Sequence, residues 1–326
     1  MNPRGSPLIS VLMPTYNCRP FLPESILCIL AQTLEDFEFI IVDDGSSDDS
    51  QTLLQQYAAR DGRIRVVRQD NSGVGAALNV ALEMARGKYL ARLDADDRTP
   101  PERFAEQVRF LDEHQDIAVV GGWYRTFGTA ESKTIELPTK PNHVKAALIF
   151  RNPIHHANVM MRNQPFRDNG WRYSTRRRFP EDYDLWVTIA ERHGLANIPR
   201  IHLDYRIWPG SVCQDPNLRW RNEMVEIQCR MLARMGLTPS AHQRAIHEAL
   251  AFDEIRAEAG FIAEAHAWLL EIDRHNRRQP ALDERGLARV LTGRYIALYR
   301  AAVRCGVPVE GLADSPFRRY VEIPLE

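Results

Sequence analysis

Cysteine is scarce in this chain of 326 residues, and its five cysteines are scattered. Their number is odd and no two of them form a C-x-x-C pair, so the sequence favours neither a disulfide framework nor a structural zinc site. A reducing compartment fits this usage best. We therefore expect a cytoplasmic protein.

Long apolar runs and an excess of charge of one sign are also missing. No stretch is apolar over the length that crosses a membrane, and residues 1–7 lack the apolar core of a signal peptide. Any membrane contact is therefore expected to be peripheral, at the inner face. The 42 Lys and Arg residues nearly balance the 43 Asp and Glu residues, which gives no overall reason to expect a nucleic-acid partner.

What the sequence does contain is an alternation of strand-like and helical segments in its first third. Helical patterns over residues 23–32 and 50–59 separate short, apolar, strand-like runs at 8–13, 37–42, 64–67 and 89–93. Such βαβ alternation predicts an α/β fold with an open, mostly parallel sheet. Further strand-like pieces follow at residues 117–120, 159–161 and 198–206.

The pattern becomes almost entirely helical after residue 216, so we predict a domain boundary near residue 213. Residues 1–212 would form the α/β domain and residues 213–326 a helical appendage. One apolar helix face in this appendage has two interpretations. It either packs inside a small helical bundle or lies on a membrane that carries a lipid-linked substrate; its residues are Leu287, Leu291, Leu298 and Ala302.

Acidic residues gather where the fourth strand-like run ends, at Asp94, Asp96 and Asp97. Open α/β sheets bind ligands at the carboxyl ends of their strands. An Asp-x-Asp pair there can hold a hard divalent cation against a diphosphate. Taken alone, the pattern also fits an ordinary acidic turn that leads into a helix.

Three more segments of the predicted sheet follow strand ends. Tyr16 comes after the first strand, where its ring can stack on a base. The second strand ends in Asp43 and Asp44, followed by Asp48, and a carboxylate there can accept from a uracil N–H or a ribose hydroxyl, although an ordinary turn and helix cap is the alternative. Gly73 and Gly75 open the helix after the third strand. This G-x-G lacks a third glycine and does not follow the first strand, which argues against a dinucleotide-binding fingerprint.

A second acidic group stands at the start of a helix, at Glu181, Asp182 and Asp184. One of these carboxylates can act as a general base. The alternative is the ordinary preference of acidic residues for the first turn of a helix.

In chain order, the segments P-T-Y-N, V-D-D-G-S-S-D, G-x-x-x-A-x-N, D-A-D-D and P-E-D-Y-D-L-W resemble family 2 of the inverting glycosyltransferases, which have the GT-A fold. The resemblance covers roughly residues 8–212, with a donor half at about 8–115 and an acceptor half at about 116–212. It implies that Asp182 is the catalytic base and that Asp96 ligates Mn²⁺ or Mg²⁺. It also implies donor-nucleotide contacts from Pro14, Tyr16, Asp44, Asn79 and Asp94.

The same resemblance assigns acceptor or diphosphate contacts to Glu181, His156, Arg178 and Trp208. Trp208 stands where many relatives have a histidine, so we expect no second protein ligand for the metal there. The implied partners are a nucleotide-sugar donor, with a UDP-sugar favoured, and a glycan or lipid-linked acceptor of cell-envelope polysaccharide synthesis. A homo-oligomer is left open.

Two other functions remain as alternatives. A sugar nucleotidyltransferase also uses an α/β sheet with acidic metal ligands, but residues 14–18 are not the glycine-rich triphosphate loop that it needs. A non-catalytic binding protein could have kept the fold. The presence of Asp94, Asp96 and Asp182 argues against that second alternative.

Overall fold

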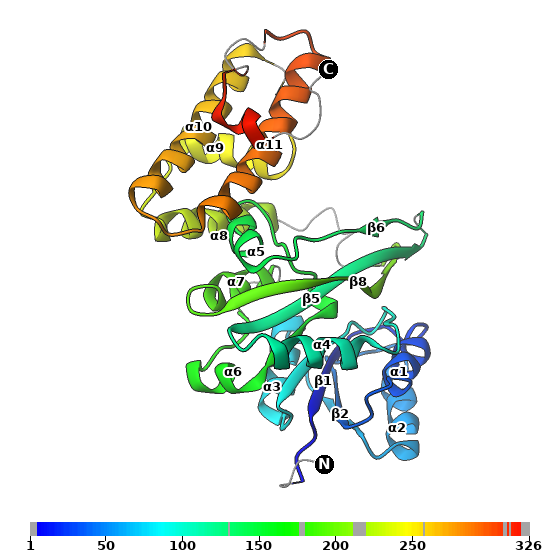
Figure 1. The fold of residues 1–326 in the computed structure, drawn as a ribbon. Helices are drawn as coiled ribbons and strands as arrows, with labels where there is room; N and C mark the ends of the chain where they lie inside the picture. The colour runs from blue at the N-terminus through cyan, green and yellow to red at the C-terminus, as the bar shows by residue number, and fades with distance from the viewer. Residues whose placement is uncertain are drawn as a thin grey trace. The chain divides into compact units, whose positions relative to one another are not determined.

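The computed structural model describes residues 5–129, 131–175, 180–210, 220–256, 258–308, 312 and 314–320. The chain divides into two compact units. The sheet unit comprises Met1–Thr139 and Ile154–Trp220, and the helical unit comprises Lys140–Pro153 and Arg221–Glu326 (Figure 1). The chain thus passes from one unit to the other three times, which the sequence did not suggest.

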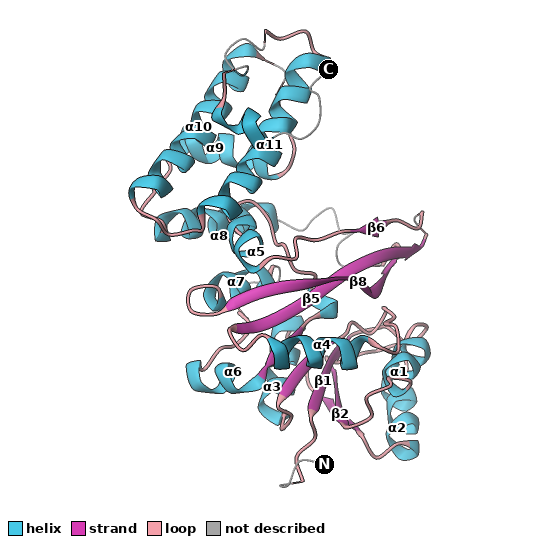
Figure 2. Ribbon diagram, viewed as in Figure 1, coloured by secondary structure: helices cyan, strands magenta, loops and turns pink. Residues whose placement is uncertain are grey.

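The sheet unit contains a mixed sheet, whose strands are magenta in Figure 2. The strand order is β3-β2-β1-β4-β7-β5-β6, with β8 beside β5. Within the described residues its strands are β1 Ile9–Thr15, β2 Phe37–Asp43, β3 Ile64–Arg68, β4 Tyr89–Arg92, β5 Ile117–Gly128, β6 Thr134–Ile135, β7 Met160–Arg162 and β8 Gly194–Ile207. The first four strands are mutually parallel, as are β5 and β8, whereas β6 and β7 run antiparallel to their neighbours. The predicted α/β class with a mostly parallel open sheet is confirmed.

Helices connect and cover these strands. They are α1 Leu22–Leu30, α2 Ser50–Arg60, α3 Val74–Met84, α4 Arg103–Glu113, α6 Asn163–Asn169 and α7 Glu181–Ile189, with a 3₁₀ turn, η1, at His156–Asn158. Every residue of β1 and β2 is buried, as expected for strands with both faces covered. One face of β1 packs in a cluster with the apolar stripes of α1 and α4.

The strand register brings the predicted site residues to one edge. In the parallel pairing, Thr15 of β1 lies beside Asp43 of β2, and Leu12 lies beside Arg92 of β4. The residues that follow these strands therefore emerge at the same carboxyl edge of the sheet.

The helical unit consists of α5 Pro141–Ala147, α8 Trp220–Arg234, α9 Ala241–Ala251, α10 Ala259–Arg278, α11 Glu284–Arg304 and the 3₁₀ turn η3 Pro316–Tyr320. Its four predicted face residues, Leu287, Leu291, Leu298 and Ala302, are at most 1% exposed. Bundle packing is therefore the interpretation that holds for this face, because a buried face is not available to a membrane. In the described parts of the chain, no helix combines the length and apolar character of a membrane span.

Residues 140–153 are held in the helical unit by buried polar contacts. Gln228 Nε2 donates to the Phe150 carbonyl oxygen at 2.8 Å, and His247 Nε2 lies 2.8 Å from the Ile149 carbonyl oxygen. His247 Nδ1 accepts from the Trp268 indole at 3.1 Å, so its proton sits on Nε2. Burial lowers the pKa of His247 to about 4, which keeps this ring neutral.

This anchoring predicts that a fragment ending near residue 216 aggregates. Without the C-terminal helices, the side chains of Val144, Leu148, Ile149 and Phe150, now at most 1% exposed, lose their cover. Size-exclusion chromatography and dye binding to exposed apolar surface would measure the effect. Polar replacement of Ile149 and Phe150 in the same fragment should restore solubility. A monodisperse fragment that binds no dye would contradict the prediction.

Candidate active site

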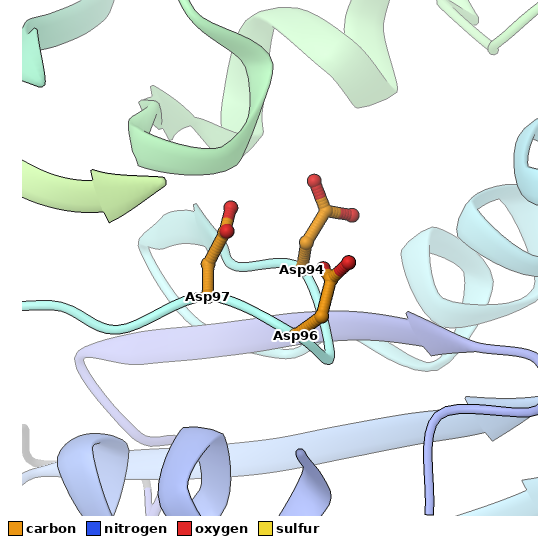
Figure 3. A group of neighbouring side chains, drawn as sticks. All are labelled: Asp94, Asp96 and Asp97. Atoms are coloured by element: carbon orange, nitrogen blue, oxygen red, sulfur yellow. The ribbon is translucent and has the colours of Figure 1, made fainter. Parts of the chain in front are cut away.

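The Asp94–Asp97 turn carries three carboxyl groups on one side of the chain, directly beyond β4 (Figure 3). One carboxyl oxygen from each of Asp94, Asp96 and Asp97 lies within 4.8 Å of those of the other two. The backbone N–H of Asp97 donates to the carbonyl oxygen of Asp94 at 3.3 Å, which closes the turn. The strand and this turn together hold the three groups close to one another.

Arg92, the last residue of β4, neutralises Asp94. Its guanidinium donates to both carboxyl oxygens of Asp94, at 2.6 and 2.5 Å. The Arg92 side chain is only 4% exposed, whereas that of Asp94 is 29% exposed. A bidentate pair of this kind fixes the orientation of the carboxylate as well as its charge.

The two other acids of the turn are held from the end of β8. Trp208 Nε1 donates to Asp96 Oδ2 at 2.7 Å, and the backbone N–H of Arg206 donates to Asp97 Oδ1 at 2.8 Å. Burial, and next the negative charge of Asp94, raise the pKa of Asp96 and the pKa of Asp97. Such crowding of carboxylates favours whatever brings positive charge to the turn, a proton or a cation.

The turn fits a divalent metal ion. Its ligand atoms are all carboxyl oxygens, the donors that Mg²⁺ and Mn²⁺ prefer. Asp97 is fully buried, and its Oδ2 has no hydrogen-bond partner among the described residues. A buried carboxyl oxygen without a partner beside two other carboxylates is stabilised when a cation binds.

A second acidic pair, Glu181 and Asp182, lies at the start of α7. Glu181 is 3% exposed and Asp182 is 7% exposed. Burial, and next the charge of Asp182, raise the pKa of Glu181 to about 8. Glu181 Oε2 has no hydrogen-bond partner in the described part of the chain, and its Oε1 lies 3.6 Å from His156 Nδ1.

His156 and Tyr173 lie near this pair. His156 Nε2 lies 3.1 Å from the Tyr173 hydroxyl, and the His156 ring packs edge-on against Trp186. Burial, with the charge of Arg92 as the second cause, lowers the pKa of His156 well below its usual value. His156 is therefore a neutral hydrogen-bonding group.

Asn79 of α3 holds the segment that carries Tyr173. Its Nδ2 donates to the Tyr173 carbonyl oxygen and its Oδ1 accepts from the Tyr173 N–H, both at 2.9 Å. Both polar ends of the Asn79 amide are engaged with this backbone, so Asn79 positions Tyr173 in this structure. The donor contact of Asn79 stays a prediction.

The two acidic clusters meet through Arg92. The positive charge of Arg92 acts on both Asp94 and Glu181, and the charge of Asp94 contributes to the raised pKa of Glu181. Residues almost ninety positions apart in the sequence therefore share one electrostatic environment. Arg92 was not predicted, although a charged residue inside an apolar strand is a signal that it must have a buried partner.

The expected nucleotide side of the site shows a mixed outcome. Tyr16 follows β1 and is 50% exposed, so its ring is open to stacking. Asp44 is 4% exposed. Its carboxylate accepts from Gln69 Nε2 at 2.6 Å and from the backbone N–H groups of Ser72 and Gly73 at 2.9 and 2.8 Å. In this structure Asp44 orders the loop that leads into α3.

Two further predicted residues cannot be placed as expected. Pro14 is buried inside β1, opposite Val42 of β2, rather than beyond the end of the strand. A nucleotide contact from Pro14 stays a prediction. Arg178 lies outside the described residues.

The raised pKa of Glu181 gives a test of this geometry. A folded-state pKa of about 8, above the usual 4.5, means that the stability contributed by protonated Glu181 is complete below about pH 4.5 and is lost as the pH rises through about 8. Glu181→Gln removes this titration. We expect the melting temperature of the variant, relative to the wild type, to be higher at pH 8.5 than at pH 5. A pH-independent difference would show that Glu181 is ionised in the folded protein.

Comparison with known proteins identifies the family. The family model for glycosyl transferase family 2 matches residues 10–179 of this chain. An uncharacterized glycosyltransferase of Haemophilus influenzae is 31% identical over 212 residues, which are 62% of this chain and 66% of that protein. The putative glycosyltransferase EpsE of Bacillus subtilis is 36% identical over 193 residues, 57% of this chain and 68% of EpsE. The putative teichuronic acid biosynthesis glycosyltransferase TuaG of the same organism is 43% identical over 108 residues, 33% of this chain and 43% of TuaG.

Solved structures support the fold. Residues 1–349 of S. aureus TarS, in complex with UDP-GlcNAc, superimpose with a TM-score of 0.60 at 15% identity, over 91% of this chain and 88% of that one. The mannosyltransferase PcManGT of Pyrobaculum calidifontis, in complex with GDP-Man and Mn²⁺, gives a TM-score of 0.50 at 16% identity, over 98% of this chain and 84% of that one.

This chain belongs to glycosyltransferase family 2. The predicted family, its GT-A fold and the class of enzyme, a transferase, are thereby confirmed. The sequence matches span about two thirds or less of the curated relatives described above.

Proposed function

We propose that this protein transfers a sugar from a nucleoside-diphosphate sugar to an acceptor hydroxyl, with inversion at the anomeric carbon. The observation that carries the proposal is the convergence of the Asp94–Asp97 turn and the Glu181–Asp182 pair on Arg92. One carboxylate cluster is suited to a cation and a diphosphate, and the other is suited to proton transfer.

The roles divide between the two clusters. Asp96, with Asp94 and Asp97 beside it, would hold Mn²⁺ or Mg²⁺. When bound, the metal supplies positive charge to the departing diphosphate. Tyr16 would stack on the base of the donor.

Asp182 would act as the general base. As the acceptor oxygen forms its bond to the anomeric carbon, its proton passes to Asp182, and the bond from that carbon to the diphosphate oxygen breaks with its electron pair leaving on the diphosphate. Glu181, whose pKa is raised to about 8, keeps its proton at neutral pH and so does not add a second negative charge beside the base.

The substrates are proposed from the relatives. TarS was solved with UDP-GlcNAc and PcManGT with GDP-Man, and a UDP-sugar remains our favoured donor. TuaG is named for teichuronic acid biosynthesis, which supports a glycan or lipid-linked acceptor of the cell envelope. A cytoplasmic location, peripheral membrane contact and a homo-oligomer stay predictions.

A screen of nucleotide sugars tests the proposal. We expect one UDP-, GDP- or TDP-sugar to raise the melting temperature with Mn²⁺, and to be hydrolysed slowly or transferred. The anomeric configuration of the product, read by NMR, should be opposite to that of the donor. Turnover of a nucleoside triphosphate would instead indicate a nucleotidyltransferase. Binding of a nucleotide sugar without turnover would indicate a non-catalytic protein.

A further inference from the structure

Residues at the end of β8 form several hydrogen bonds with the Asp94–Asp97 turn. The Arg206 side chain donates from Nε to the Asp96 carbonyl oxygen at 2.7 Å, in addition to the bond from its backbone N–H to Asp97. Two residues further on, the Trp208 indole N–H reaches Asp96 Oδ2 at 2.7 Å. The indole therefore occupies a carboxyl oxygen of the residue expected to ligate the metal.

The position of the indole is set by its neighbours. The rings of Trp208 and Phe21 lie 5.0 Å apart, inclined at 59°. The Arg206 guanidinium stacks over the same Phe21 ring at 4.6 Å and pairs with Glu24 of α1. Trp208 thus meets Asp96 from a packed aromatic group and not as an isolated surface side chain.

An indole N–H differs from every metal ligand in one respect. It is a donor only, with no lone pair to offer. Its hydrogen carries positive charge to the carboxylate, which is what a cation would do at the same oxygen. The N–H and a cation therefore compete for Asp96 Oδ2.

The carboxylates of Asp94 and Asp97 are also engaged by hydrogen-bond donors, so they do not make up for the loss of charge at Asp96 Oδ2. Both oxygens of Asp94 are engaged by Arg92, and Asp97 Oδ1 is engaged by Arg206. Without nucleotide, an incoming cation meets acids that are already partly neutralised. On the buried Asp97 it meets Oδ2, which has no hydrogen-bond partner among the described residues.

We propose that Trp208 controls metal binding in this protein, because its indole N–H takes up part of the negative charge at Asp96 Oδ2 with which a divalent cation would otherwise bind. The free protein then binds the cation weakly. A nucleoside diphosphate, which brings its own oxygens and negative charge, makes exchange of the indole for the cation favourable. This inference rests on the proposed function and adds to it a residue that sets the order of binding.

Trp208→Phe tests the competition, because phenylalanine keeps an aromatic ring beside Phe21 but has no N–H. A hydrogen bond to a charged group contributes enough that its removal should tighten Mn²⁺ binding about tenfold in the absence of nucleotide. Electron paramagnetic resonance of free Mn²⁺ measures this affinity. Trp208→His, which offers a nitrogen lone pair in place of the N–H, should also tighten it.

Trp123→Phe is the matched control. The Trp123 indole donates to the backbone carbonyl oxygen of Leu137 at 3.0 Å, so the change removes an indole hydrogen bond whose acceptor is a backbone oxygen and not a carboxylate of the candidate site. Its Mn²⁺ affinity should equal that of the wild type. Unchanged or weaker Mn²⁺ binding by both folded Trp208 variants would overturn the inference.

A second readout observes Trp208 directly in the unmodified sequence. With 5-fluorotryptophan incorporated, the ¹⁹F resonance that disappears in either Trp208 variant should shift when Mg²⁺ and UDP or GDP are added, and the Trp123 resonance should not. A Trp208 resonance that stays in place while nucleotide binds with Mg²⁺ would refute the exchange but leave the proposed function intact. Absence of any metal-dependent nucleotide binding by the wild type would refute both.

Discussion

Replacement of Asp182 by Asn is expected to lower turnover by about 10²–10⁴-fold while donor affinity changes little. Asparagine preserves the size of the side chain at the start of α7 but cannot accept a proton. Its amide can still contact the Tyr183 N–H through its oxygen, as Asp182 Oδ1 does now at 2.7 Å. Initial rates of transfer at saturating donor, with donor affinity from calorimetry, separate the two effects.

Asp184→Asn provides the control for this variant. Asp184 lies in the same first turn of α7 and undergoes the same chemical change, but its side chain is less buried than that of Asp182. Turnover close to that of the wild type is expected. Wild-type turnover by Asp182→Asn would instead show that the base is misassigned, and Glu181 and Asp184 would be the next residues to test.

Replacement of Asp96 by Ala is expected to abolish the effect of metal on nucleotide binding. A ligand present at one hundred times its dissociation constant stabilises a protein by about 2.7 kcal/mol. We expect UDP or another nucleoside diphosphate to raise the melting temperature of the wild type more in the presence of Mn²⁺ or Mg²⁺ than in the presence of EDTA. In Asp96→Ala the two conditions should give the same melting temperature, because the predicted metal ligand is gone.

Asp36→Ala is a suitable control, since Asp36 is an exposed acid immediately before β2, at the opposite edge of the sheet. It should keep the metal-dependent difference. Equal stabilisation of the wild type with and without metal would contradict the assignment of Asp96.

The sequence predicted the strands and the edge of the sheet well, for a physical reason. Buried parallel strands are continuous apolar runs, so their ends are visible, and the acids after them share an edge whatever the details of packing. Asp94 and Asp96 could therefore be placed at this edge from the sequence alone. The start of α7 could be located in the same way, because acidic residues precede an apolar helical pattern.

The contacts that organise the site could not be predicted in this manner. Asn79 binds the backbone of a residue 94 positions away, and Arg92 serves acids from two distant segments. Such pairings follow from tertiary packing, which leaves no periodic trace in the sequence. The hydrogen bonds of Asp44 to residues 69–73 were missed for the same reason, since a turn acid has many nearby donors to choose from.

The chain crosses between the two units three times, and this affects how the protein folds during its synthesis. Residues 140–153 leave the ribosome well before the helices that bury them, because α11 ends only at Arg304. About 150 residues must still be translated, which takes roughly 8–30 s at a synthesis rate of about 5–20 residues per second. During that interval Ile149 and Phe150 of the nascent chain lack their final cover. This segment is therefore one that a holding chaperone would protect during synthesis.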